Sequence, residues 1–346
     1  MMFKGILFCV TGGLAAAFFA FPFRGIRGWR YECQWFIYSV AGLVVFPLLL
    51  GLVTCPDLFG VISGARPVTL LKCFGFGALW GLGGLTWGLM LRYLGIGLGT
   101  VIGCGLCSSV GTLLPPVLEG RAGDLVSGTP ALITLASVAV SLVGIGLIGL
   151  AGKFKEGELS EEERRKAVAD FDFKKGITVA LFSGIACSGL NFGLQSGLPL
   201  EEPARLAGAG ADWVGIPALV VVLWGGFAVN LVWCLRENRK NGSFRDYTTP
   251  SVKASLPLNY LLAASAGVIW ACQSACQKIG EPALGEIRFV SFALVMGAAV
   301  LFSTVLGVVL GEWKGTGTRT RSTLFIGILV LLISIGLAVA AKGIQA

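Results

Sequence analysis

Histidine is absent from this sequence, and charged residues are scarce: Asp, Glu, Lys and Arg make up only 13% of its 346 residues. Histidine is the side chain that proteins use most readily as a general base near neutral pH and as a metal ligand. The long apolar stretches also contain no pair of carboxylates that could act as general acid and base. We therefore expect no enzyme, no metal site and no bound cofactor.

Apolar residues are abundant instead, at 55% of the chain with a mean hydropathy of +0.82. They form runs long enough to cross a bilayer, which takes ~20 helical residues. We predict an all-α polytopic membrane protein with ten transmembrane helices. We expect the first to remain as a membrane helix, because only Lys4 precedes it and no cleavage pattern ends it. Segments one to ten span 5–23, 33–53, 70–90, 95–116, 130–151, 176–196, 213–235, 255–278, 287–310 and 323–343.

The net charge of +8 is unevenly distributed, which argues against a nucleic-acid partner. Of the 27 Lys and Arg residues, 19 lie in the connections that follow segments one, three, five, seven and nine. Because basic residues accumulate on the cytoplasmic side of a membrane, these connections should face the cytoplasm. The sequence thus predicts a multi-pass protein of the bacterial inner membrane with both termini outside, in the periplasm.

The longest polar stretch, residues 153–175, separates five segments from five. We interpret it as a cytoplasmic connector between a first repeat, 1–152, and a second repeat, 176–346. Short matches link the halves: Lys-Gly-Ile opens both at 4–6 and 175–177, and Ile-Gly-Leu recurs at 145–147 and 335–337. Because five is odd, the halves would cross the membrane in opposite senses. Such a 5+5 inverted-topology repeat is a recurrent transporter design with its site near the midplane.

Glycines follow one face of segment three at helical spacing. Small residues let membrane helices approach backbone to backbone. Segment four repeats glycine every fourth residue at 95, 99 and 103, so we predict that segments three and four pack together. The residues assigned to helix packing are Gly77, Gly81, Gly84 and Gly88.

Polar and aromatic side chains also share helical faces within several apolar segments. Because polar groups in hydrocarbon need partners, such faces indicate a buried interface or a cavity. Amides supply donors and acceptors to hydroxyl groups, and tryptophan offers a broad apolar face, which suits a neutral polyol. The alternative is that they only bridge helices. The candidate substrate-binding residues are Trp80, Thr86, Trp87, Asn191, Gln195, Asn230, Trp270, Gln273 and Gln277.

Coupling to protons requires a group whose protonation changes during transport. The carboxylates closest to the apolar segments are Glu32, at the start of segment two, and Glu286, at the start of segment nine. We assign both as candidates, the alternative being that each is a solvated charge at the interface. The expected partners are a small neutral sugar, a proton and membrane lipid, and the protein would be a monomer or a homodimer.

The stretch FGALWGLGGLTWGLMLRYLG at 76–95 resembles the third segment of the L-rhamnose–proton symporter family, within the drug/metabolite transporter superfamily. Further matches follow in order: PFR at 22–24, VGTL at 110–113, Trp270 with Gln273 and Gly280, and EW at 312–313. The resemblance runs nearly end to end. It implies the ten-helix 5+5 fold and proton-driven uptake of a deoxy-sugar across the inner membrane.

Some positions depart from what the resemblance leads us to expect. Gly84 and Thr86 stand where the family suggests asparagine, and Gln277 stands where it suggests an aromatic residue. A carrier or exporter of another metabolite, such as an amino acid or an amphipathic compound, therefore remains an alternative. An anionic, nucleotide-linked substrate would need paired cations at the midplane, which these segments lack.

Overall fold

A computed structural model describes residues 2–118, 120, 123, 126–158, 173–249, 255–309 and 313–340. In these residues all regular structure is helical, and nine helices are long and apolar enough to span a membrane. The helices are α1 (Met2–Phe18), α2 (Tyr31–Ser39), α3 (Phe46–Thr54), α4 (Leu58–Ser63), α5 (Pro67–Leu118), α6 (Gly128–Glu158), α8 (Phe173–Cys187), α9 (Gly189–Ser196), α10 (Glu201–Leu206), α11 (Ile216–Asn241), α12 (Leu256–Leu284), α13 (Ser291–Val309) and α14 (Thr318–Ala340).

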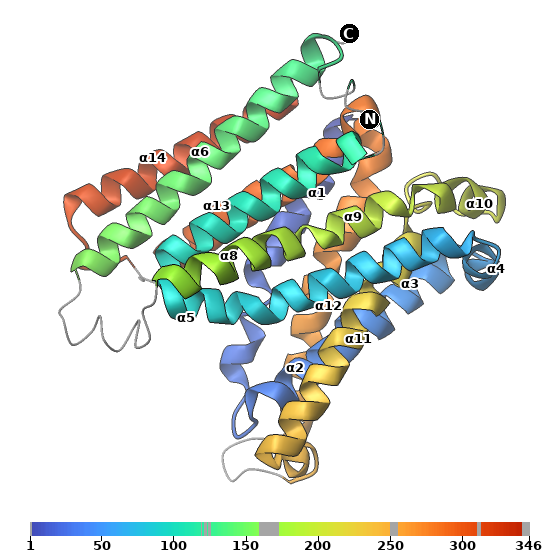
Figure 1. The fold of residues 1–346 in the computed structure, drawn as a ribbon, viewed down its shortest axis with the longest axis horizontal. Helices are drawn as coiled ribbons and strands as arrows, with labels where there is room; N and C mark the ends of the chain where they lie inside the picture. The colour runs from blue at the N-terminus through green and yellow to red at the C-terminus, as the bar shows by residue number, and fades with distance from the viewer. Residues whose placement is uncertain are drawn as a thin grey trace.

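Segment four is the one predicted span not found among the nine; its described part contains a shorter apolar helix, Ile102–Gly111. It belongs to α5, which continues through segments three and four. A straight helix would place Gly103 about 24 Å from Trp87. Instead, a Cβ on Gly103 would touch Trp87 and Met90. Helix α5 therefore turns back on itself, and its two arms pack together (Figure 1).

Two of the predicted segments are interrupted helices. Segment two passes from α2 into α3 through a π-helical turn, η2 (Val40–Val45), just before Pro47. Proline cannot donate a backbone hydrogen bond, which explains the irregular turn ahead of it. Segment six breaks at Ser188, between α8 and α9. Irregular backbone at membrane depth is tolerated where it is buried in protein or lines a cavity. We therefore expect both breaks to lie inside the helix bundle.

Glycine contacts determine how α5 packs. Gly77 lies against the backbone of Val222 in α11, and Gly81 lies against Gly226 one turn further on. The sequence predicted segment four as the partner of this glycine stripe. Segments three and four do pack together, through Gly103 against Trp87 and Met90. Gly77 and Gly81 of the stripe, however, meet α11, which presents Gly225 beside Gly226 and allows the two backbones to approach. An added Cβ on Gly84 or Gly88, both also assigned to packing, would meet nothing within 4 Å.

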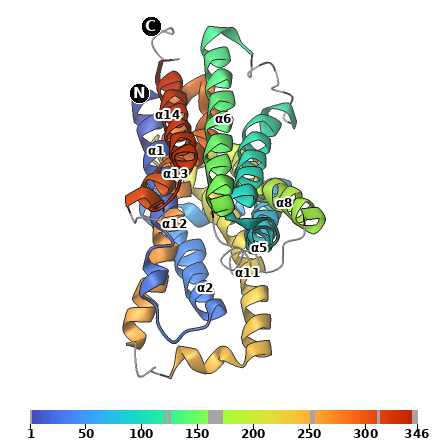
Figure 2. The ribbon, with the colours of Figure 1, turned by 90° about the vertical axis from the view of Figure 1, so that its left-hand side faces the viewer.

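The connections gather at two ends of the molecule (Figures 1 and 2). One, which we call the η1 end, comprises the lower and left-hand edges of Figure 1, with η1 (Pro22–Gly25) and η5 (Ser243–Tyr247) at the bottom and the turn into α14 at the left. There Asn259 donates to the carbonyl of Arg27, and Thr320 donates to Glu158. The other, the α10 end, holds α4, α10, η6 (Gly285–Val290), the start of α1 and the end of α14.

The α5–α11 contact leads to a stability prediction. Gly77→Ala places a methyl group on the Val222 backbone, so we expect a lower unfolding temperature and a loss of about 1–3 kcal/mol. Gly75→Ala is the matched control, because its Cβ meets nothing within 4 Å on the same helix. Thermal unfolding of the purified protein in detergent measures both. Equal unfolding temperatures for the two variants would contradict the packing described.

Candidate functional site

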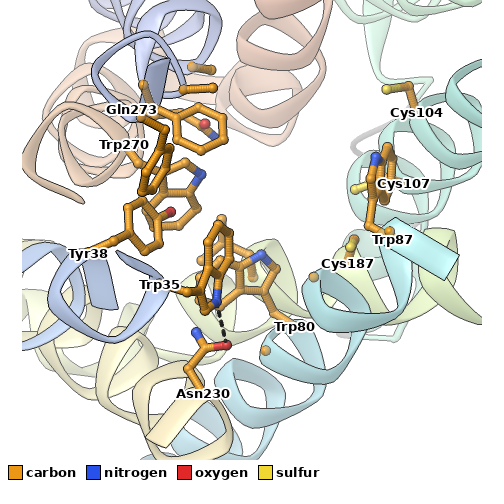
Figure 3. Close-up of a pocket in the computed structure, with 18 of the residues that line it drawn as sticks. Trp35, Tyr38, Trp80, Trp87, Cys104, Cys107, Cys187, Asn230, Trp270 and Gln273 are labelled. Carbon is orange, nitrogen blue, oxygen red and sulfur yellow. Dashed lines mark hydrogen bonds between the residues drawn. The ribbon is translucent and has the colours of Figure 1, made fainter. Parts of the chain in front are cut away.

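A cavity of about 590 Å³ lies between α1, α2, α5, α11, α12 and α13 (Figure 3). This volume is within the range of about 300–1,000 Å³ usual for small-molecule sites. The residues that line it include Phe19, Phe23, Tyr31, Gln34, Trp35, Tyr38, Trp80, Gly81, Gly84, Trp87, Gly88, Cys104, Cys107, Cys187, Leu190, Asn230, Trp270, Gln273, Phe292 and Met296.

Aromatic rings form much of the cavity wall. Trp80 and Trp270 stack with their ring centroids 4.7 Å apart, which joins α5 to α12 across the cavity. On the α2 side, Trp35 stacks on Tyr38 at 4.6 Å. The indole nitrogen of Trp35 donates to Asn230 Oδ1 at 3.2 Å, which holds ring and amide together (Figure 3). The rings offer flat apolar faces with polar groups at their edges.

The cavity wall is mostly apolar, with a few uncharged polar groups. Among its described lining residues none is ionisable as Asp, Glu, Lys or Arg, whereas Gln34, Asn230 and Gln273 present amides. Gly84 and Gly88 also face this space, where an added Cβ would meet nothing within 4 Å. The absence of side chains at these two positions widens the cavity. The arrangement suits an uncharged solute that carries several hydroxyl groups on a compact apolar frame.

The structure divides the predicted binding residues into two groups. Five of them line the cavity: Trp80, Trp87, Asn230, Trp270 and Gln273. Thr86 lies outside the lining and shares a 2.6 Å hydrogen bond with Ser183 of α8. Asn191, Gln195 and Gln277 are buried beyond the cavity, where Gln277 donates to Asn191 Oδ1 at 2.9 Å.

The second group surrounds a buried carboxylate, Glu281, which is 0% exposed. Its Oε2 accepts from Lys278 Nζ at 2.6 Å, and Lys278 is itself only 1% exposed. Its Oε1 accepts from Ser291 Oγ at 2.9 Å and from the amides of Gln195 and Gln277, both at 3.3 Å. These donors replace the water that a buried carboxylate loses.

Two further charges complete this cluster. Arg288 of η6 lies 3.7 Å from Glu281 and donates to Glu201 of α10 at 2.8 Å. Glu201 also lies 3.4 Å from Lys278. The Glu281 cluster, as we call Glu201, Lys278, Glu281 and Arg288, therefore holds two negative and two positive charges, and its formal charges cancel.

The sequence analysis missed Glu281, although a signal was present. On α12, Gln273, Gln277 and Glu281 follow at intervals of four, so the polar face of segment eight continues one turn beyond its predicted end at residue 278. The charge of Lys278 predicts the end of the apolar run at that residue, which leaves Glu281 outside the segment. The structure extends α12 to Leu284, past Pro282.

Of the two predicted coupling carboxylates, Glu32 lies away from the Glu281 cluster. Glu32 is at the η1 end, where Ser243 Oγ and Asn241 Nδ2 donate to its Oε1 at 2.7 and 3.0 Å. It thus ties α2 to the end of α11 and to η5. The backbone of Glu286 belongs to η6, but its side chain lies outside the described part of the structure.

The cavity and the cluster occupy successive levels along the molecule. Phe23, Tyr31 and Gln34 extend the lining toward the η1 end, and Tyr31 is 55% exposed. Toward the α10 end, the Glu281 cluster lies beyond Gln273 on α12. Membrane-spanning helices around a solute-sized, uncharged cavity, with a closed ionic layer on one side, define a helical membrane transport protein.

Comparison with known proteins gives the family. The sequence matches the L-rhamnose-proton symport protein family over residues 1–344, and the chain belongs to that family. It is 32% identical over 345 residues to the L-rhamnose-proton symporter of Cronobacter sakazakii, covering 98% of each chain. The Yersinia pestis symporter of the same name is 32% identical over 345 residues, with 97% of this chain and 98% of the relative covered. The Escherichia coli symporter is 30% identical over 332 residues, 95% of each chain.

The buried ion pair leads to a second stability prediction. Lys278→Met and Glu281→Gln each leave an unbalanced charge in the interior, so each should cost about 3–5 kcal/mol of folding free energy. The double variant restores the balance and should regain most of that loss. Unfolding temperatures of the four proteins in detergent form a double-mutant cycle. Losses that simply add would show that the pair does not act as a unit.

Proposed function

We propose that this protein takes up L-rhamnose, or a closely related deoxy-sugar, together with protons across the bacterial inner membrane. The observation that carries the proposal is the full-length match to L-rhamnose-proton symporters, joined to an uncharged, aromatic and amide-lined cavity. Rhamnose is neutral, carries hydroxyl groups for the amides, and has a methyl group and ring face that can stack on indole. We also propose placement in the drug/metabolite transporter superfamily.

We propose ten membrane helices arranged as a 5+5 inverted repeat, with residues 1–152 and 176–346 as the halves and 153–175 between them. Residues 159–172 of that connector lie outside the described structure. Helix pairing supports the repeat, because exchanging each segment for the one five places along reproduces the observed contacts. Segment one packs on segments eight and nine, and segment six packs on three and four. Segment three packs on seven, and eight packs on two.

The fifth and tenth segments complete the same pattern. They are exchanged for each other by the repeat, and they form one pair, α6 with α14, at one side of the molecule (Figure 1). Gly144 of α6 touches Leu331, and Gly327 of α14 touches Ile148. A contact between two equivalent helices is what an axis relating the halves would produce.

We propose that the η1 end faces the cytoplasm, since the connections rich in Lys and Arg gather there. Both termini would then face the periplasm. In this orientation the cavity extends toward the cytoplasm, and the Glu281 cluster closes its periplasmic side. The structure would correspond to a state of the transport cycle that faces inward.

Within the cavity, we propose that Trp80 and Trp270 stack on the sugar and that Asn230 and Gln273 bind its hydroxyl groups, with Trp87 opposite. The other predicted residues, Thr86, Asn191, Gln195 and Gln277, would act from behind the lining. Their described bonds tie α5 to α8 and α9 to α12. Glu32 and Glu286 remain coupling candidates from the sequence.

The test is uptake of labelled L-rhamnose into proteoliposomes, with and without an inward proton gradient. We expect accumulation that a protonophore abolishes. Gln273→Ala should raise the half-saturating rhamnose concentration about tenfold, because losing a buried hydrogen bond costs about 1–2 kcal/mol.

The matched control is Thr178→Ala, an exposed α8 residue that bonds only the Lys174 carbonyl. It should behave as the unaltered protein does. No rhamnose uptake, together with binding of another metabolite detected by tryptophan fluorescence, would overturn the substrate. Unchanged affinity in Gln273→Ala would overturn only the assignment of that residue.

A further inference from the structure

The Glu281 cluster separates the cavity from the α10 end with a layer of buried charge. Lys278 and Glu281 come from α12, while Glu201 and Arg288 reach them from α10 and η6. The polar face of α12 runs from the cavity to this layer, through Gln273 and Gln277.

We propose that Glu281 carries the coupled proton and that the Glu201–Arg288 pair is the gate that covers it. The inference deepens the proposed rhamnose–proton symport and rests on it. Glu281 is a fully buried carboxylate, it lies two helical turns from the cavity residue Gln273, and two cations face it. Glu32 lies at the η1 end, on the far side of the cavity.

The charge balance of the cluster indicates when Glu281 gains its proton. With the gate closed, Lys278 and Arg288 stabilise the carboxylate, and an added proton would leave a net positive charge in the interior. Opening the gate withdraws Arg288, so one stabilising cation is lost. Glu281 then takes one proton from the external water and becomes neutral. Closure returns Arg288, and the proton leaves toward the cavity.

A neighbouring acceptor fits this cycle. Gln277 Oε1 is buried and has no hydrogen-bond partner among the residues described. The same amide group lies beside Glu281, with its Nε2 at 3.3 Å from Oε1. When Glu281 is protonated, its new O–H group can donate to such an acceptor. The site thus offers partners to both forms of the acid.

The gate residues lie on short elements outside α12. Glu201 opens the six-residue helix α10, and Arg288 lies in the six-residue turn η6. Pro282 follows Glu281 and cannot donate a backbone hydrogen bond, and Gly285, with φ of 62°, ends α12. The proposed opening would bend the chain in this stretch, between Glu281 and Arg288.

Other titratable groups near the cluster are less suited to this role. Cys9 of α1 lies near Gly280, and Cys73 of α5 lies near Gly197. Both thiols are 0% exposed. Glu201 also contacts both cations but is 19% exposed, whereas Glu281 is 0% exposed and accepts from Ser291 as well as from Lys278.

The experiment compares two assays on the same proteoliposomes: exchange of labelled L-rhamnose, which needs no gradient, and accumulation driven by an inward proton gradient. In Glu281→Gln we expect exchange to persist while the accumulation ratio falls to about one. Glu202→Gln, an exposed neighbour of Glu201 that pairs with Arg205, is the control and should accumulate rhamnose normally.

Two further variants keep the test decisive. If Glu281→Gln does not fold, the charge-balanced Lys278→Met/Glu281→Gln protein is assayed instead, with the same expectation. Arg288→Gln retains Glu281 but removes one of the cations that stabilise its carboxylate, so Glu281 should stay protonated to higher pH. The pH at which rhamnose uptake falls should therefore be more alkaline in this variant than in the unaltered protein. If the pH dependence of rhamnose uptake is the same in Arg288→Gln as in the unaltered protein, the proposal is contradicted.

The outcomes separate the two levels of the argument. Gradient-driven accumulation by Glu281→Gln or by the double variant overturns the role of Glu281 and leaves the symport intact. If Glu32→Gln instead abolishes accumulation while exchange persists, the coupling carboxylate lies at the η1 end. If the unaltered protein neither exchanges nor accumulates rhamnose, the proposed function itself fails.

Discussion

The ion pair between Lys278 and Glu281 is the constraint around which the interior is organised. Two charges at 1% and 0% exposure cost several kcal/mol each to remove from water, so hydrogen-bond donors must gather around the buried carboxylate. This requirement accounts for Ser291 and for the amides on α9 and α12, which have no place in a purely apolar bundle. It also fixes α10 and η6 over the end of α12, since Glu201 and Arg288 complete the balance. The cavity, by contrast, lacks charge and is built from rings.

Glycine provides the second constraint. In a membrane, helices associate through packing, and close backbone contact requires that side chains be absent. The contacts of Gly77 with α11 and of Gly42 with Gly267 of α12 have this character. Gly84 and Gly88 use the same lack of a side chain differently, because they leave space in the cavity wall. One stripe of glycines therefore serves packing along half its length and solute access along the other half.

The sequence was sufficient to predict helices, since apolar runs and their spacing depend on local residues alone. It also placed Trp80, Trp270 and Gln273 on interior faces, because helical periodicity orients side chains. It could not predict that the glycine stripe meets α11, which depends on a distant pair of glycines. Nor could periodicity separate Gln273, in the cavity wall, from Gln277, one turn beyond it. Glu281 was missed because charge was used to end a membrane segment, whereas here the charge is paired and buried within the helix.

The two levels of the site explain how sugar and proton could depend on each other without touching. Helix α12 contributes residues to both levels. Trp270 and Gln273 face the cavity, and Glu281 lies two turns beyond Gln273 on the same helix. A sugar that draws α5 and α12 together across the Trp80–Trp270 stack would shift the helix that holds Glu281 relative to α10 and η6. Movement of one rigid helix then changes solute access and the charge around the acid together. Coupling of this kind requires a contact that is made in one state of the transporter and absent in the other. In the proposal, the Glu201–Arg288 ion pair is that contact, formed when the gate is closed and broken when it opens.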